Sequence, residues 1–372
     1  MMMACYGRPM LKRKTTFVIG AGSSWDFGFP LGDGLRDQIV GLLAVENPNA
    51  SVNFSDPDMA SVLRERATQE AGTSKWTDRL QVYRRAAAII RDGLPFARSI
   101  DGFLDGLRDE PEVEFLGKLA IATLILRAES GSPLKPSQIA AANADEIRAA
   151  QIAQLVGSWH ALLGQMLYDG HTRDSIDTVF EHASFVVFNY DRCIEEFFTV
   201  SLMRRFAINR PRALGVLAKC RIIHPYGQVG GFSPDAAGHV PFGEVDPRHL
   251  VEVASRIRTF TEAMEQRVAD DVKDSIAGAE IIVFMGFGWL PQNMELLHAS
   301  DRVTEATKVF ATTKAMDPRE IMVVEQQIDR MLRRKDYTPE YAGQPAASPE
   351  FTSDRGDCKA LMNNCWLRLT GP

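Results

Sequence analysis

The feature that most constrains the fold of this chain is a short apolar run that opens into glycines near its start. Phe17-Val18-Ile19 is followed directly by Gly20-Ala21-Gly22-Ser23-Ser24. An unbroken run of aromatic and β-branched residues is typical of a strand that is buried on both faces. The apolar residues that follow recur at helical spacing, at Leu31, Leu35, Ile39, Leu42 and Leu43. The sequence therefore predicts a strand, a glycine turn and a helix.

The glycine turn has two interpretations. Gly20 and Gly22 carry no Cβ, so backbone N–H groups at this turn could approach a pyrophosphate. The stretch is not a complete G-x-G-x-x-G motif, because Trp25 stands three residues after Gly22. Strand-to-helix turns also need small residues for structural reasons alone. The turn by itself leaves both a nucleotide-binding and a purely structural role open.

Composition excludes several classes of protein. The 372 residues carry a net charge of −6, which argues against a basic nucleic-acid-binding surface. No apolar stretch approaches the roughly 18 residues of a membrane span or forms a signal peptide. The cysteines are scattered, without the spacing of a zinc site or a disulfide framework. We therefore expect a cytoplasmic protein that has no metal site, no membrane contact and no direct nucleic-acid site.

Further strands alternate with helices along the chain. This order predicts an α/β fold, a Rossmann-like doubly wound parallel sheet with a large all-α insertion between its first two strands. The sequence has helical periodicity from about 77 to 170, and we expect this segment to form the insertion. The strands expected after it are 184–188, 220–223, 279–285 and 308–313, with a further edge strand at 365–369.

Helices are predicted from apolar periodicity and capping residues. A short helix is expected around 59–70, and Ser137 can cap a long helix that extends through Leu167. Asp246-Pro247 is expected to start another long helix through Ile276, and Asp317-Pro318 a helix through Leu332.

Polar residues follow two of the predicted strands at the point where each strand ends. Asn189 and Asp191 come after 184–188, and His224 follows 220–223. Open α/β sheets place ligand chemistry at the carboxyl ends of their strands, so these residues are candidates for a site. The structural alternative is that Asn189 caps the next helix while Asp191 faces the helix dipole. His224 is a general-base candidate or a satisfied structural histidine.

An ordered set of motifs resembles one known family. Each motif follows a predicted strand, in this order: Gly20-Ala21-Gly22-Ser23-Ser24 with Gly28-Phe29-Pro30, Asn189-Tyr190-Asp191, His224-Pro225-Tyr226-Gly227, and Gly286-Phe287-Gly288-Trp289. The set resembles the SIR2 (sirtuin) NAD-binding family, and most closely its bacterial branch of NAD-hydrolysing antiphage effectors. The resemblance implies one SIR2-like domain over 1–372. Its NAD-binding core would be 15–44 and 180–335, its helical insertion 45–179 and its C-terminal tail 336–372.

The resemblance also implies a role for each matched residue. Asn189 would be the catalytic asparagine beside the nicotinamide ribose, and His224 would be the general base, neutral near pH 7. Asp191 would contact the carboxamide of NAD+. The residues implied to bind NAD+ are Gly20, Ala21, Gly22, Ser24, Phe29, Pro30, Asp191, Gly227, Gly286, Phe287, Gly288, Asn293 and Thr312.

Two departures from the protein-deacylating sirtuins affect the expected reaction. Pro30 is followed by Leu31-Gly32-Asp33 in place of Asp-Phe-Arg, and the zinc-binding cysteine quartet is absent from the sequence. These departures favour simple cleavage of NAD+ to nicotinamide and ADP-ribose, in an abortive-infection role that only the resemblance implies. The alternatives are a NAD-dependent deacylase or ADP-ribosyltransferase, and a non-catalytic sensor of NAD or ADP-ribose.

A toxic NAD-depleting enzyme must be held inactive in an unstressed cell. We therefore expect a homo-oligomer or a state controlled by a partner, built on the helical insertion. The resemblance implies that this partner would be a co-encoded ATPase, helicase-type or other sensor protein.

Overall fold

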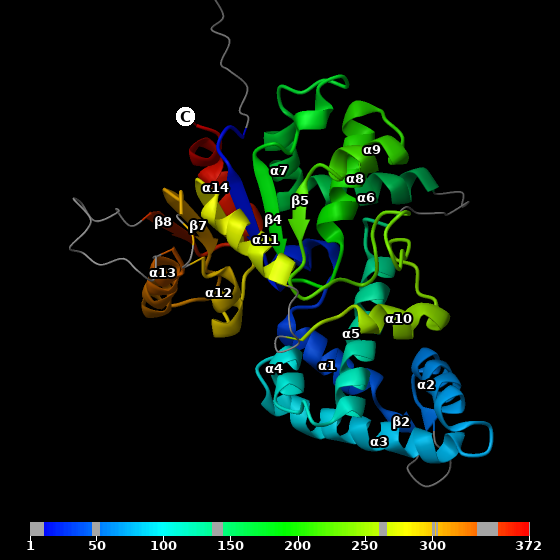
Figure 1. Cartoon of the computed structure of the whole chain (residues 1–372). Coiled ribbons are helices and arrows are strands. Elements are labelled where there is room, and N and C mark those ends of the chain that lie inside the picture. Colours follow the sequence, from blue (N-terminus) through cyan, green and yellow to red (C-terminus); the bar gives the residue numbers. More distant parts are fainter. Residues whose placement is uncertain are drawn as a thin grey trace, which may run out of the picture.

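The computed structural model has a six-stranded, fully parallel sheet as its central element (Figure 1). It describes residues 11–46, 53–135, 144–259, 266–299, 302, 304–332 and 349–371. In spatial order the strands are β5 (Arg221–Ile223), β4 (Ala183–Val187), β1 (Thr15–Ile19), β6 (Ile281–Met285), β7 (Lys308–Thr312) and β8 (Glu350–Asp354).

Counted along the chain, these strands have the order 3-2-1-4-5-6 that is typical of doubly wound dinucleotide-binding folds. β1 lies at the centre and pairs with β4 on one side and β6 on the other, so that Phe17 is level with Phe185 and Val283. The order in which successive strands are added to the sheet reverses between β1 and β6. In open parallel sheets the crevice at this switch point, beyond the carboxyl ends of the strands, is where ligands bind.

Helices cover both faces of the sheet. The central strands β1 and β6 are buried along their whole length, which explains their continuous apolar sequence. One face is covered by α7 (Trp159–Tyr168), α8 (Cys193–Phe206) and α14 (Cys358–Thr370), which pack on one another. The other face is covered by α11 (Gln266–Ala277), α12 (Pro291–Leu297) and α13 (Pro318–Leu332).

A second group of helices lies beyond the carboxyl ends of the strands (Figure 1). At its centre is α5, which is apolar on almost all sides and packs against α1, α3 and α10. Most of the group comes from the segment between β1 and β4, and α10 comes from the segment between β5 and β6. Its members are α1 (Gly32–Leu42), α2 (Pro57–Ala71), α3 (Trp76–Gly93), α4 (Ile100–Asp105), α5 (Pro111–Gly131) and α10 (Leu250–Ser255).

The smaller elements complete the described chain. They are the 3-10 helices η1 (Ala21–Phe27), η2 (Leu94–Phe96), η3 (Ile176–Thr178) and η4 (Pro247–His249), the hairpin strands β2 (Val45–Glu46) and β3 (Asn53–Phe54), and the helices α6 (Ala144–Val156) and α9 (Arg210–Leu217). The strands predicted at 17–19, 184–188, 220–223, 279–285 and 308–313 are confirmed as β1, β4, β5, β6 and β7. The helix predicted around 59–70 is confirmed as α2.

Two long helices predicted from the sequence are interrupted. The helix expected through Leu167 is divided into α6 and α7 at Gly157-Ser158, where the Ser158 hydroxyl accepts a hydrogen bond from Ala161 N–H and starts α7 anew. Its predicted cap, Ser137, lies outside the described residues. The helix expected through Ile276 ends at Ser255, because Arg258 N–H donates to Tyr226 O in the β5 loop instead of continuing the helix.

The prediction of an edge strand at 365–369 is wrong. These residues belong to α14, whose first turn is capped by Asp357 accepting from Ala360 N–H. The buried residues of α14 recur at helical spacing, at Cys358, Leu361, Met362, Cys365 and Leu369. The edge strand of the sheet is β8, which pairs in parallel with β7.

Candidate active site

The glycine turn after β1 is bonded to the turn after β6. Gly20 N–H donates to Met285 O and Gly22 N–H donates to Gly286 O, each at 3.0 Å. Ser23 N–H donates back to Gly20 O. The amides of these three residues are therefore used within the protein, which differs from the expectation that Gly20 and Gly22 present them to a pyrophosphate.

The glycines at this point are required by the close approach of two backbones. A Cβ on Gly20 would lie 2.6 Å from Gly286 O, and a Cβ on Gly286 would lie 2.3 Å from Ser23 N. Gly286 also has φ +59°, a conformation that side-chain-bearing residues rarely adopt. The structural interpretation of the glycine turn therefore accounts for these residues. Ala21 and Gly288 remain exposed at the same edge.

A chain of buried polar side chains links this turn to the end of β4. Asn189 donates through Nδ2 to Gly20 O at 3.2 Å and to Ser24 Oγ at 3.0 Å. Ser24 in turn donates to Asp191 Oδ2 at 3.0 Å. The structure thus brings together three residues that the sequence singled out, from segments more than 160 positions apart.

Asp191 also bonds to the first residue of α8. Its Oδ1 accepts a hydrogen bond from Cys193 N–H, the first residue of the helix, at 3.0 Å. The structural alternative placed Asp191 in the first turn of the helix, whereas Asp191 precedes α8 and accepts from its first N–H. Asn189 does not cap the helix. Burial raises the pKa of the Asp191 carboxyl, and its hydrogen bonds to Cys193 and Ser24 oppose that shift.

His224 joins the same polar chain from the end of β5. Its Nδ1 lies 3.2 Å from Asn189 O, and its Nε2 lies 2.9 Å from Glu195 Oε1. Both ring nitrogens therefore face acceptors, which suits an imidazolium that donates from each. Burial lowers the pKa of His224, but the adjacent Glu195 carboxylate outweighs burial and the net shift is upward. The Glu195 contact favours the charged ring, in the direction opposite to the neutral His224 that the resemblance implies.

Glu195 is the site residue that the sequence analysis missed. It lies in the first turn of α8, which begins two residues after Asp191. Its Oε1 pairs with His224, and its buried Oε2 has no hydrogen-bond partner among the described residues. A carboxylate in the first turn of the helix that follows 184–188 is the signal that could have identified it. A free carboxylate oxygen beside a histidine is an acceptor for a hydroxyl or a water.

The predicted residues near β6 make structural contacts within the protein. Thr312 Oγ1 accepts from Gly286 N–H at 2.8 Å, which fixes the turn after β6 to the end of β7. Asn293 Oδ1 accepts from the Tyr226 hydroxyl at 2.6 Å, so the β5 loop reaches across to α12. Phe287 is buried and packs edge-on against Phe188, with 5.2 Å between ring centroids.

The other predicted residues lie around the turns. Phe29 is buried, with its N–H 3.4 Å from Ser24 O, and Pro30 is half-buried beside it. Gly227 has φ +74°, and a Cβ there would lie 2.1 Å from Arg256 O. Gly227 therefore permits the β5 loop to pack against the segment after α10.

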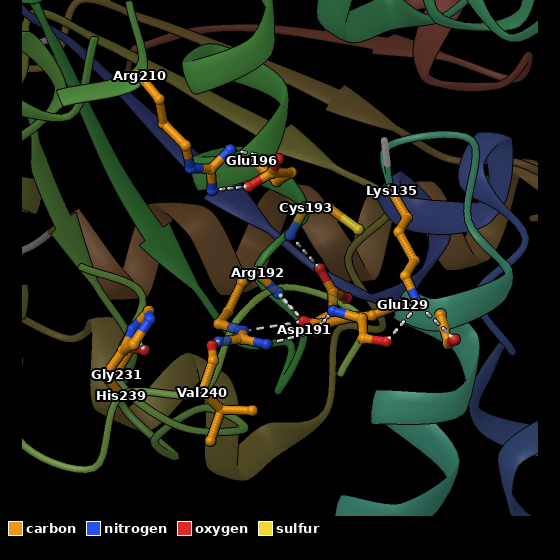
Figure 2. Close-up of polar contacts among 12 residues, drawn as sticks. Glu129, Lys135, Asp191, Arg192, Cys193, Glu196, Arg210, Gly231, His239 and Val240 are labelled. Carbon is orange, nitrogen blue, oxygen red and sulfur yellow. Dashed lines mark hydrogen bonds and ion pairs between the residues drawn. The ribbon is translucent and has the colours of Figure 1, made fainter. Parts of the chain in front are cut away.

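A fully buried ion pair fastens the end of β4 to the helical group. Figure 2 shows the Arg192 guanidinium held by Glu129 of α5, with Nε to Oε1 at 3.0 Å and Nη2 to Oε2 at 2.5 Å. Glu129 also accepts from Gly243 N–H, and Arg192 donates to Val240 O. This clamp ties the residue next to Asp191 to α5 and to the loop after β5.

A cavity of about 390 Å³ borders the site on its β5 side. His224 and Gln228 contribute to its lining, together with Arg256 and Arg258 from the segment after α10. The residues of the glycine turn do not line it. The polar chain thus has the buried glycine turn on one side and this cavity on the other.

Within the described part of the chain, no cluster of three or more His, Cys, Asp or Glu side chains could hold a metal ion. None of its helices is long and apolar enough to cross a membrane. Comparisons with protein-family models, curated proteins and solved structures gave no match for this chain.

Proposed function

We propose that this protein hydrolyses NAD+ to nicotinamide and ADP-ribose. The observation that carries the proposal is the hydrogen-bonded chain from Ser24 through Asn189 to His224, which follows the carboxyl ends of β1, β4 and β5. The chain starts beside β1, at the switch point where doubly wound sheets bind dinucleotides. The resemblance of the strand-end motifs to the SIR2 family supports NAD+ as the substrate, with the helices between β1 and β4 as an insertion in that fold.

The reaction requires the protein to position NAD+ and the attacking water and to accept one proton. Nicotinamide leaves from C1′ of the ribose with the electron pair of the glycosidic bond, and a water oxygen bonds to C1′ in its place. The water loses one proton, which a general base accepts. Asn189, whose amide is fixed by Gly20 O and Ser24, would orient the ribose or the attacking water.

His224 is the proposed base, and Glu195 fixes its tautomer. With Nε2–H donating to Glu195, the nitrogen that accepts a proton is Nδ1. Nδ1 lies 3.2 Å from the backbone oxygen of Asn189, so the ring must turn away from that oxygen before Nδ1 can accept a proton from water. This nitrogen must be deprotonated first, because only the neutral ring can accept a proton. Activity should therefore rise with pH through the raised pKa of His224.

The proposal is tested by incubating the purified protein with NAD+ alone and separating the products. Release of nicotinamide and ADP-ribose by the wild type, and its loss in folded His224→Ala, are the expected results. A requirement for an acylated peptide, or transfer of ADP-ribose to protein, would indicate a deacylase or transferase instead. Binding of NAD+ without turnover would indicate a sensor.

A further inference from the structure

The cavity beside His224 has several basic residues in its lining. Arg256, Arg258 and His224 belong to it, and the described lining residues include no Asp or Glu. At about 390 Å³ the cavity is within the size range of small-molecule sites. Charges of one sign around a low-dielectric hollow focus the potential and attract ligands of opposite charge.

Arg256 is held in place by the backbone rather than by a strong ion pair. Its guanidinium packs against Gly238, where a Cβ would lie 2.0 Å from Nη2. Its ionic contact is to Glu252 at 3.1 Å, and the Glu252 side chain is 58 % exposed. Exposed pairs of this kind are weak, so the Arg256 charge is only weakly compensated. Its buried Nε has no hydrogen-bond partner among the described residues.

Gln228 contributes an unused acceptor to the same cavity. Its Oε1 is buried and has no hydrogen-bond partner among the described residues. A buried amide oxygen without a donor has an uncompensated desolvation cost. A hydroxyl group on a ligand would satisfy it after a small side-chain movement. Pro225 and Val268 supply apolar surface in the lining, which suits the carbon skeleton of a small molecule.

We propose that this cavity binds a small sugar phosphate, with the phosphate on Arg256 and a sugar hydroxyl on Gln228. Guanidinium groups bind phosphate oxygens with two parallel hydrogen bonds, so the weakly paired Arg256 suits a phosphate group. The site differs from the proposed NAD+ site, with which it shares only the His224 wall. The binding therefore goes beyond NAD+ hydrolysis and can be measured without it.

Isothermal titration of the full chain with ribose 5-phosphate tests this proposal, with uncharged ribose as the matched probe. Saturable binding of ribose 5-phosphate, and none of ribose, is expected. Arg256→Gln should weaken binding by about tenfold or more. The matched control is Arg248→Gln, because Arg248 is 80 % exposed and lies outside the cavity lining. That control should leave the affinity unchanged.

Gln228→Leu separates the two halves of the ligand. It should weaken ribose 5-phosphate and leave the weaker binding of inorganic phosphate unaltered. The proposal is overturned if ribose binds as tightly as its phosphate, or if Arg256→Gln keeps its melting temperature and its affinity. Competition by NAD+ for the same site would also overturn it, since the cavity would then belong to the dinucleotide site.

Discussion

The two halves of the carboxyl edge of the sheet are built in different ways. Between β1 and β6 the two turns meet through backbone atoms, and Gly20 and Gly286 leave no space for a side chain. Beyond β4 and β5 the edge carries polar side chains. His224 pairs with Glu195, and its other ring nitrogen lies 3.2 Å from the backbone oxygen of Asn189. Motif glycines on the first half are explained by packing, whereas the groups able to move a proton all lie on the second.

Breaking the buried ion pair between Arg192 and Glu129 should cause the largest loss of stability. Arg192→Met leaves the Glu129 carboxylate buried without its cation, since both side chains are 0 % exposed. Removing one partner of such a pair costs about 3–5 kcal/mol in the free energy of unfolding. Chemical denaturation measures the loss. Arg248→Met, in an exposed pair with Asp246, is the control and should change stability by less than about 0.5 kcal/mol.

At the contact between the turns after β1 and β6, one added methyl group should lower the stability nearly as much. In Gly286→Ala the new Cβ meets Ser23 N at 2.3 Å and the residue keeps φ +59°, so we expect a loss of about 2–4 kcal/mol. In Gly288→Ala, two residues away, the Cβ has no atom within 4 Å. Thermal melting of the two variants should therefore differ clearly. Equal melting temperatures would contradict the packing explanation of the glycines.

The smallest predicted effect is a change in pH dependence. Glu195→Gln removes the carboxylate that raises the pKa of His224, so that pKa should fall. In the wild type the pair stabilises the fold fully below the unfolded histidine pKa of about 6.5, and this stabilisation disappears as pH rises through the higher folded value. The variant should lose that contribution at low pH. NMR titration of His224 measures the shift, and an unchanged titration would show that Glu195 does not act on the ring.

Much of the fold could be predicted because its signals are local. β1 and β6 are continuous apolar runs, and a strand buried on both faces needs nothing else to be recognised. The break after Ser255 could not be predicted, because it depends on a hydrogen bond from Arg258 to Tyr226 in a different segment. The strand assigned to 365–369 was a misreading of the helical period of α14.

The sequence predicts individual residues of the candidate site but not the contacts between them. Asn189, Asp191 and His224 follow strands and could be chosen from the sequence alone. Their connections could not, since the partner of His224 is a helix residue, Glu195, that no strand end marks. The role of Gly286 depends on which turn lies against it, and only the strand order shows that.

The most direct test of the proposed site compares nicotinamide release from NAD+ by the wild type and by Asn189→Ala. The variant removes the amide that links Gly20 O to Ser24, but leaves the His224–Glu195 pair in place. If Asn189 positions the reacting groups, its rate at saturating NAD+ should fall roughly 10²-fold or more while the fold is retained. A folded Asn189→Ala protein that releases nicotinamide at the wild-type rate would contradict the assignment of the reaction to this polar chain.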